Sequence, residues 1–172
     1  YRPGLDMPLA EKNTSVLIIG GGISGITAAV EAAETGCQVY LVEKEAFLGG
    51  QVARMNEYFP KLCPPSCGLE INFSRIRRNP RIEVICSATL EKVEGQPGAL
   101  TANIIIQPEY VNSKSTICGD CEPVCPIEVK DLFNFGLSTR KTIALPHIMA
   151  FPARYHLDEN SCTKEVCGKC VE

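Results

Sequence analysis

The sequence predicts an α/β domain of the Rossmann type, followed by a small segment rich in cysteine. A run of apolar residues ends in a Gly-x-Gly-x-x-Gly motif, and a second apolar run ends on an acidic residue. In addition, six of the ten cysteines lie after position 117. The first two observations describe a strand–turn–helix–strand unit of the kind that binds a dinucleotide, and the third indicates metal or redox chemistry.

The opening unit spans residues 16–43. Four consecutive apolar residues, 16–19, predict a strand buried on both faces. The motif follows at once, an alanine-rich helix is expected over 23–35, and a second strand over 38–42 ends on Glu43. The three glycines of the motif are Gly20, Gly22 and Gly25.

Each glycine of the motif has a physical role. Gly20 permits the tight turn out of the strand, Gly22 lets a pyrophosphate approach the backbone, and Gly25 lets the helix pack close to the sheet. The free N–H groups of the first helical turn, with Ile23 and Ser24, face the phosphates, helped by a dipole equivalent to about +0.5 charge.

The acid at the end of the second strand completes the motif. The carboxylate of Glu43 can accept hydrogen bonds from a ribose, and Lys44 follows it directly. The alternative is a glycine-rich turn that binds nothing. The preceding strand, the following helix and the acid at this distance together favour a nucleotide.

A second glycine-rich loop follows the acid. Gly49, Gly50 and Gln51 allow the chain to pass close to a ribose and phosphates, although a simple turn has the same composition. Coupled to the upstream motif, this loop favours FAD over NAD as the nucleotide.

The middle of the chain fits an FAD-binding domain. A helix is expected over 68–79 and the next parallel strand over 81–86. Strands over 89–94 and 99–107, separated by a Gly-Gln-Pro-Gly turn, predict an antiparallel β-meander as the crossover. The resulting domains are a lead-in over 1–14, an FAD-binding domain over 15–111 and a cysteine-rich insert over 112–172, which should hold little secondary structure.

Composition excludes several classes of function. A net charge of −3 gives no case for nucleic-acid binding. No apolar run approaches the length that spans a membrane and no signal peptide is visible, so membrane association is expected only through a partner.

The first cysteine cluster is the end of a bacterial ferredoxin motif. Cys118, Cys121 and Cys125 have the spacing Cys-x2-Cys-x3-Cys and are followed by proline. The first cysteine of that motif would fall at position 115, which is Ser115.

The second cluster is Cys162, Cys167 and Cys170. In ferredoxins with two clusters the fourth cysteine of each motif binds the other cluster, so Cys125 would complete one 4Fe–4S site. The second site keeps only Cys118 and Cys121 and is incomplete in this chain. A structural zinc site is the competing interpretation, and the x3 spacing with Cys-Pro favours iron–sulfur.

The remaining cysteines have weaker signals. Cys63 and Cys67 flank two prolines and a serine, and three interpretations stay open: a redox pair near a flavin, iron–sulfur ligands, or partly buried thiols without chemistry. Cys37 and Cys86 lie at strand ends and are expected in the core.

Together these residues resemble a known family. The flavin motif, Gly-Gly-Gln, the segment 59–73 with its Cys-Pro-Pro-Ser-Cys-Gly-Leu-Glu-Ile-Asn-Phe, and the ferredoxin-like insert are similar to the A subunit of heterodisulfide reductase and its relatives. The segment looks most like the A subunit of the quinone-interacting membrane-bound oxidoreductase of sulfate reducers, and a sulfur-oxidising branch is also similar.

The resemblance implies a cytoplasmic protein with FAD, iron–sulfur and a thioredoxin-reductase-like flavin fold, which passes electrons between partner subunits. It also implies that the backbone near Leu90 faces the adenine. Because the rest of that fold is missing, the chain looks like the N-terminal part of a longer protein. The candidate FAD-binding residues are Gly20, Gly22, Ile23, Ser24, Gly25, Glu43, Lys44, Gly49, Gly50, Gln51 and Leu90.

The first hypothesis for the function is therefore an oxidoreductase subunit that transfers electrons through FAD and one 4Fe–4S cluster. A docking module with structural cofactors is the second, and an oligomer is compatible with either. A pyridine-nucleotide–disulfide oxidoreductase using Cys63 and Cys67 is a further alternative, although these residues hold no second nucleotide motif.

Overall fold

The computed structural model of the chain describes residues 14–96, 98–112, 114–163 and 167–170. The expected lead-in over 1–14 lies outside the described residues, apart from Thr14.

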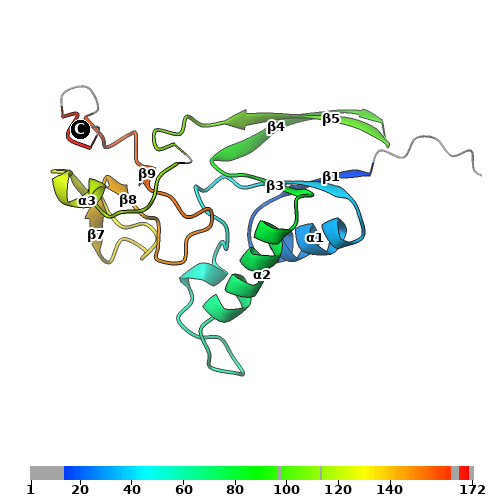
Figure 1. Cartoon of the computed structure of the whole chain (residues 1–172), viewed down its shortest axis with the longest axis horizontal. Helices are drawn as coiled ribbons and strands as arrows, with labels where there is room; N and C mark the ends of the chain where they lie inside the picture. The colour runs from blue at the N-terminus through cyan, green and yellow to red at the C-terminus, as the bar shows by residue number, and fades with distance from the viewer. Residues whose placement is uncertain (1–13, 97, 113, 164–166, 171–172) are drawn as a thin grey trace, which may run out of the picture.

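A three-stranded parallel sheet forms the centre of the molecule. Its strands are β1 (Ser15–Ile19), β2 (Gln38–Val42) and β3 (Ile82–Ile85), in the order β1-β2-β3. Helix α1 (Ile23–Glu34) connects the first two strands, and α2 (Ser66–Arg78) leads into the third. Both helices cover the same face of the sheet (Figure 1). The predicted opening unit is confirmed, and α2 begins two residues earlier than expected.

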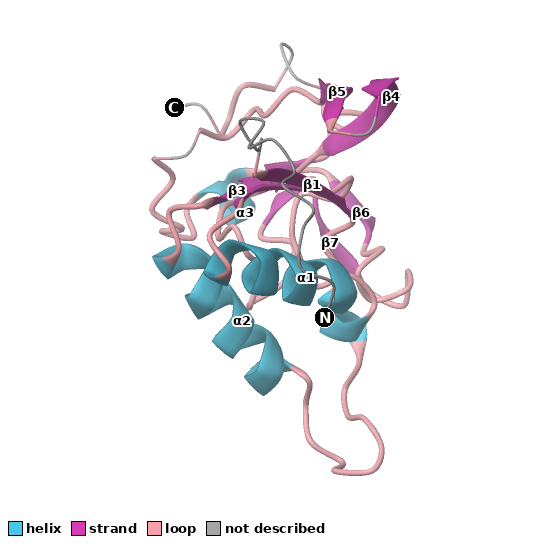
Figure 2. Ribbon diagram, turned by 90° about the vertical axis from the view of Figure 1, so that its right-hand side faces the viewer, coloured by secondary structure: helices cyan, strands magenta, loops and turns pink. Residues whose placement is uncertain are grey.

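A long β-hairpin lies over the opposite face. Strands β4 (Ala88–Gln96) and β5 (Ala99–Ile106) pair antiparallel, with an irregularity between Leu90 and Lys92. Figure 2 shows the resulting order of layers, from the helices through the parallel sheet to the hairpin. In the described residues the expected meander is this two-stranded hairpin.

The expectation that the first strand is buried on both faces is wrong. The side chains of β1 are half-buried at best, and Ile19 is 58% exposed. Because β1 is the outer strand of the sheet in the described residues, only β2 has a hydrogen-bonded neighbour on each side. An apolar run shows that a strand is hydrophobic, but it does not show whether that strand lies at the centre or at the edge of the sheet.

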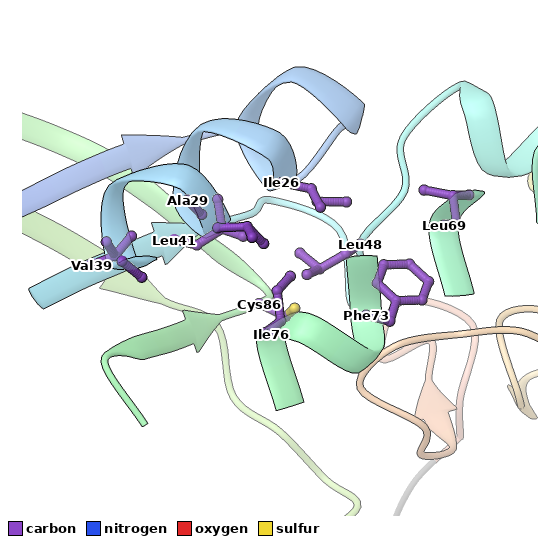
Figure 3. Packing of buried hydrophobic residues seen from close by; sticks show 11 residues of the cluster. Ile26, Ala29, Val39, Leu41, Leu48, Leu69, Phe73, Ile76 and Cys86 are labelled. Atoms are coloured by element: carbon purple, nitrogen blue, oxygen red, sulfur yellow. The ribbon is translucent and has the colours of Figure 1, made fainter. Parts of the chain in front are cut away.

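The core fills the space between the sheet and the helices. It is formed by apolar side chains of α1, β2, the loop that follows β2, and α2 (Figure 3). Cys86 belongs to it, as predicted, and burial raises the pKa of its thiol to about 12, so this thiol stays protonated at neutral pH. The buried members are Ile26, Ala29, Val30, Ala33, Val39, Leu41, Leu48, Leu69, Phe73, Ile76 and Cys86.

The segment after residue 111 contains only short elements, as expected. A four-residue helix and four strands of two or three residues make up its regular structure in the described part of the chain. These are α3 (Cys121–Val124), β6 (Glu128–Lys130), β7 (Thr139–Lys141), β8 (Ile143–Ala144) and β9 (His156–Leu157).

This cysteine-rich segment packs against the first unit through Phe151. The ring of Phe151 stacks on Phe73 of α2 at 5.1 Å between centroids, and its carbonyl accepts a hydrogen bond from the Leu48 N–H at 2.7 Å. The boundary near residue 111 therefore separates two segments in contact, and their independence as domains stays a prediction.

The core position of Leu48 gives the first test. Its side chain is fully buried, so Leu48→Ala should lower the free energy of unfolding by about 2–5 kcal/mol. Ile71→Ala, on the exposed side of α2, is the matched control and should change it by no more than about 0.5 kcal/mol. Urea unfolding of the two variants measures the difference, and equal losses would contradict the described core.

Candidate functional site

Two glycine-rich loops lie side by side at the carboxyl end of the parallel sheet. The N–H of Gly49 donates to the carbonyl of Gly21 at 2.7 Å, and Gly22 and Gly49 form a parallel bridge. Gly20 and Gly49 both have positive φ, +100° and +114°, a backbone conformation that favours glycine. The predicted second loop therefore meets the predicted motif directly.

The third glycine of the motif lies where no side chain fits. A β-carbon at Gly25 would lie 1.8 Å from the carbonyl oxygen of Gly20, so α1 can begin this close to β1 only with glycine there. At Gly22, in contrast, a β-carbon would meet no atom within 4 Å. Space is therefore open in front of Gly22, where the motif predicts a pyrophosphate.

Gly21 is a residue whose importance the sequence analysis missed. A β-carbon there would lie 2.3 Å from Leu48 Cδ2 and 3.0 Å from Glu43 Oε2. The signal was present as a third glycine in the run 20–22, but the motif leaves that position open to any residue.

Glu43 binds the first glycine loop to the segment that follows β2. Its side chain is only 6% exposed, and Oε2 accepts a hydrogen bond from the Gly21 N–H at 2.5 Å. Oε1 accepts a second from the Glu45 N–H at 2.9 Å. A carboxylate has about four acceptor positions, so two remain for the predicted contact with a ribose, which stays a prediction.

The other candidate residues surround this centre. Ile23 and Ser24 open α1, and Gln51 immediately precedes the short 3₁₀ helix η1 (Val52–Arg54). Lys44 is exposed. The hairpin starts beside the acid, because the Ala88 N–H donates to the Glu43 carbonyl at 2.9 Å, and the predicted adenine contact, Leu90, lies two residues further along β4.

The cysteines of the C-terminal segment line one cavity of about 830 Å³. Five of the six candidate ligands contribute to its wall, and Ser115 lies in the same wall. The sixth candidate, Cys118, is exposed and does not line the cavity. The five are Cys121, Cys125, Cys162, Cys167 and Cys170.

Electrostatic contacts connect these thiols. Burial raises the pKa of Cys170, and the neighbouring thiols of Cys162, Cys125 and Cys167 raise it further, while its own backbone lowers it. Burial and the thiols of Cys118 and Cys170 raise the pKa of Cys121. Cys170 therefore lies within electrostatic range of Cys125, Cys162 and Cys167, and also of Cys121.

Within the described ranges, no three Cys, His, Asp or Glu side chains lie close enough together to hold a single metal ion. The iron–sulfur and zinc interpretations of these cysteines both remain predictions.

Aromatic residues form the seam between the two segments. Phe133 stacks on His147 at 4.5 Å between centroids, and Phe47 meets both rings edge to face. The guanidinium of Arg54 lies 5.7 Å from the centre of Phe133. Burial, and then the charge of Arg54, lower the pKa of His147. The sequence analysis had given no role to His147, which serves here as a packing residue.

Comparison with known proteins agrees with this geometry. A family model described as FAD dependent oxidoreductase matches residues 15–102, which include both glycine loops, Glu43 and the hairpin. The chain belongs to the FAD-dependent oxidoreductase family. The predicted α/β fold that binds FAD and the predicted oxidoreductase class are thereby confirmed.

Individual relatives of this FAD-dependent oxidoreductase extend the match past residue 111. The iron-sulfur A subunit of CoB–CoM heterodisulfide reductase from Methanocaldococcus jannaschii is 40% identical over 96% of this chain and 25% of that protein. One of the corresponding iron-sulfur A subunits of Methanopyrus kandleri is 42% identical over 86% of this chain and 22% of that protein. Among solved structures, L-proline dehydrogenase from P. horikoshii matches 54% of this chain and 19% of that one, with TM-score 0.41 and 18% identity.

The two heterodisulfide reductase relatives confirm the resemblance to the A subunit of that enzyme. The chain spans about a quarter of the length of those curated relatives. Among its described residues, every helix is too short or too polar to cross a lipid bilayer.

The contrast between Gly25 and Gly22 can be tested in the protein without ligand. Gly25→Ala should lower the thermal midpoint or prevent folding, because its methyl group collides with the Gly20 carbonyl. Gly22→Ala meets open space and should leave the midpoint within a few degrees of the parent. Differential scanning calorimetry compares them, and a Gly25→Ala variant as stable as the parent would refute the close approach.

Proposed function

We propose that this chain is the flavin-binding and iron–sulfur-binding part of an electron-transfer subunit, similar in role to the A subunit of heterodisulfide reductase. One observation carries the proposal. The same body has a glycine cradle at the carboxyl end of a parallel sheet and a cavity lined by five cysteines. A nucleotide cradle and a thiol-lined cavity are the two elements that a flavin and iron–sulfur subunit needs.

The cradle fits the diphosphate of FAD. Gly22 is open in front, and the first N–H groups of α1 have no acceptor inside the helix. The peptide of Gly21 is fixed by Glu43 and Gly49, so the turn is held in place before a ligand arrives. We expect Gly20, Gly22, Ile23, Ser24 and Gly25 to bind the phosphates and Glu43 to bind a ribose. When bound, FAD supplies two-electron chemistry.

The thiol cavity fits iron–sulfur by its donor set. Thiolates are the usual ligands of 4Fe–4S clusters, and we infer that Cys125, Cys162, Cys167 and Cys170 hold one cluster. The pair Cys118 and Cys121, with Ser115 nearby, forms the incomplete second site. The role of the protein is to supply these thiols at fixed positions.

The partners follow from the relatives' names, which describe subunits of reductase complexes. We propose that the chain works inside a cytoplasmic redox complex and approaches a membrane only through another subunit. The branch that interacts with quinones stays a prediction based on the segment 59–73.

Metal analysis tests the iron–sulfur part. After anaerobic reconstitution, the chain should hold about four iron and four sulfide per complete cluster, with broad visible absorption that dithionite bleaches. Cys125→Ser and Cys167→Ser should each lose most of this iron. Cys37→Ser, at a half-buried thiol outside the cavity, is the control and should keep it. Zinc as the bound metal, or equal iron in all variants, would overturn the assignment.

Flavin binding tests the cradle separately. Gly22→Ala should fold like the parent but bind FAD at least about tenfold more weakly, because its methyl group fills the space predicted for the pyrophosphate. Quenching of flavin fluorescence during titration measures the affinity. Unchanged affinity in a folded Gly22→Ala variant would move the diphosphate away from this loop.

A further inference from the structure

Two further thiols, one half-buried and one exposed, belong neither to the glycine cradle nor to the cysteine cavity. Cys63 and Cys67 lie on the loop between η1 and α2 and at the start of α2, and neither lines the cavity described above. This loop projects from the body in two perpendicular views (Figures 1 and 2).

The loop is closed on itself by backbone hydrogen bonds. Tyr58 N–H donates to the Cys63 carbonyl at 3.3 Å, and Leu62 N–H donates to the Tyr58 carbonyl at 2.8 Å. Tyr58 and Cys63 form an antiparallel bridge. Pro64 and Pro65 fix the backbone between the two cysteines, because the φ of proline is fixed by its ring. The sulfur of Cys63 is therefore presented by a constrained turn.

A phenol lies beside the two thiols. The pKa of Tyr58 is raised first by a hydrogen bond to Cys63, then by the charge of Cys63, by burial and by the charge of Cys67. A phenol O–H is a hydrogen-bond donor, and a sulfur is an acceptor for it. The antiparallel bridge sets Tyr58 beside Cys63, and three residues separate Cys63 from Cys67 in the sequence.

Access differs between the two thiols. Cys67 is exposed and stands second in α2, whereas Cys63 is half-buried. Attack on an external disulfide needs an accessible sulfur, and release of the product needs a second thiol close by. This assigns the attacking role to Cys67 and the resolving role to Cys63.

The helix that carries Cys67 also adjoins the cradle. Leu69, two residues after Cys67, lies beside Gly49, since a β-carbon on Gly49 would be in van der Waals contact with Leu69 Cδ1 at 3.6 Å. The helix that carries Cys67 therefore packs directly against the second glycine loop.

We propose that Cys63 and Cys67 form a thiol–disulfide redox pair that reduces an external organic disulfide. The Cys67 thiolate attacks one sulfur of the disulfide, a Cys67 mixed disulfide forms, and the first thiolate leaves. Cys63 then attacks the Cys67 sulfur, which releases the second thiolate and leaves a Cys63–Cys67 disulfide. Two electrons pass from the pair to the external disulfide, whose two thiolates take up the two protons.

Apolar side chains flank the pair and indicate the class of substrate. Phe59 is 87% exposed and Leu62 is 65% exposed, on the turn that ends at Cys63. A disulfide within a polypeptide offers apolar neighbours to such side chains, and oxidised glutathione offers few. We therefore expect insulin to react faster than oxidised glutathione at equal disulfide concentration.

The experiment uses the whole chain, reduced and kept without air. It is incubated with oxidised glutathione or with insulin, free thiols are alkylated, and peptides are identified by mass spectrometry. The expected product is a peptide with a Cys63–Cys67 bridge, with one equivalent of disulfide reduced per chain. Cys63→Ser should stop at the mixed disulfide on Cys67, and Cys67→Ser should lose nearly all reduction. Cys37→Ser, at a half-buried thiol on another loop, should behave like the parent.

Tyr58→Phe separates chemistry from packing. It removes only the hydroxyl beside Cys63, so it should slow the second step and accumulate the mixed disulfide while the thermal midpoint stays unchanged. A Tyr58→Phe variant with the parent's rates would exclude the phenol from the proposed role.

Two results would overturn the pair itself. The first is full alkylation of Cys63 and Cys67 after incubation with either oxidised glutathione or insulin. The second is protection of both from alkylation in the iron-loaded protein, relieved by an iron chelator, because this result would make them iron ligands. The readout follows thiols alone, so failure here is distinct from failure of the flavin or the iron–sulfur proposal.

Discussion

The geometry of the site depends on the backbone N–H and carbonyl of Gly21. Its N–H donates to the buried carboxylate of Glu43, and its carbonyl accepts from the N–H of Gly49. One residue therefore joins the end of β1, the end of β2 and the second glycine loop. A carboxylate makes a stronger hydrogen bond with an N–H than a neutral acceptor does. The hydrogen bond from Gly21 to the buried Glu43 therefore fixes the turn before any ligand is present.

The sequence was sufficient to predict structure that depends on local patterns. The strand over 38–42, the helix after the motif and the hairpin followed from periodicity and turn residues, which act over a few positions. The exposure of β1 could not be predicted, because it depends on which strands lie beside it. The role of Gly21 also escaped, since a carboxylate twenty-two residues away decides it.

For the cysteine site, too, the sequence predicts one part and misses another. Ferredoxin spacing grouped Cys125 with Cys162, Cys167 and Cys170, and all four line one cavity. Their common cavity depends on the path of the chain between residues 126 and 161, for which no sequence rule exists. The seam of Phe47, Phe133 and His147 was missed for the same reason. In the sequence, each of these residues looks like an ordinary core residue.

Leu48 connects the two halves of this arrangement. Its side chain is fully buried, and its methyl group occupies the space that a side chain at position 21 would need. Its N–H binds the carbonyl of Phe151, which belongs to the cysteine-rich segment. The same residue thus supports the glycine cradle on one side and anchors the cysteine-rich segment on the other.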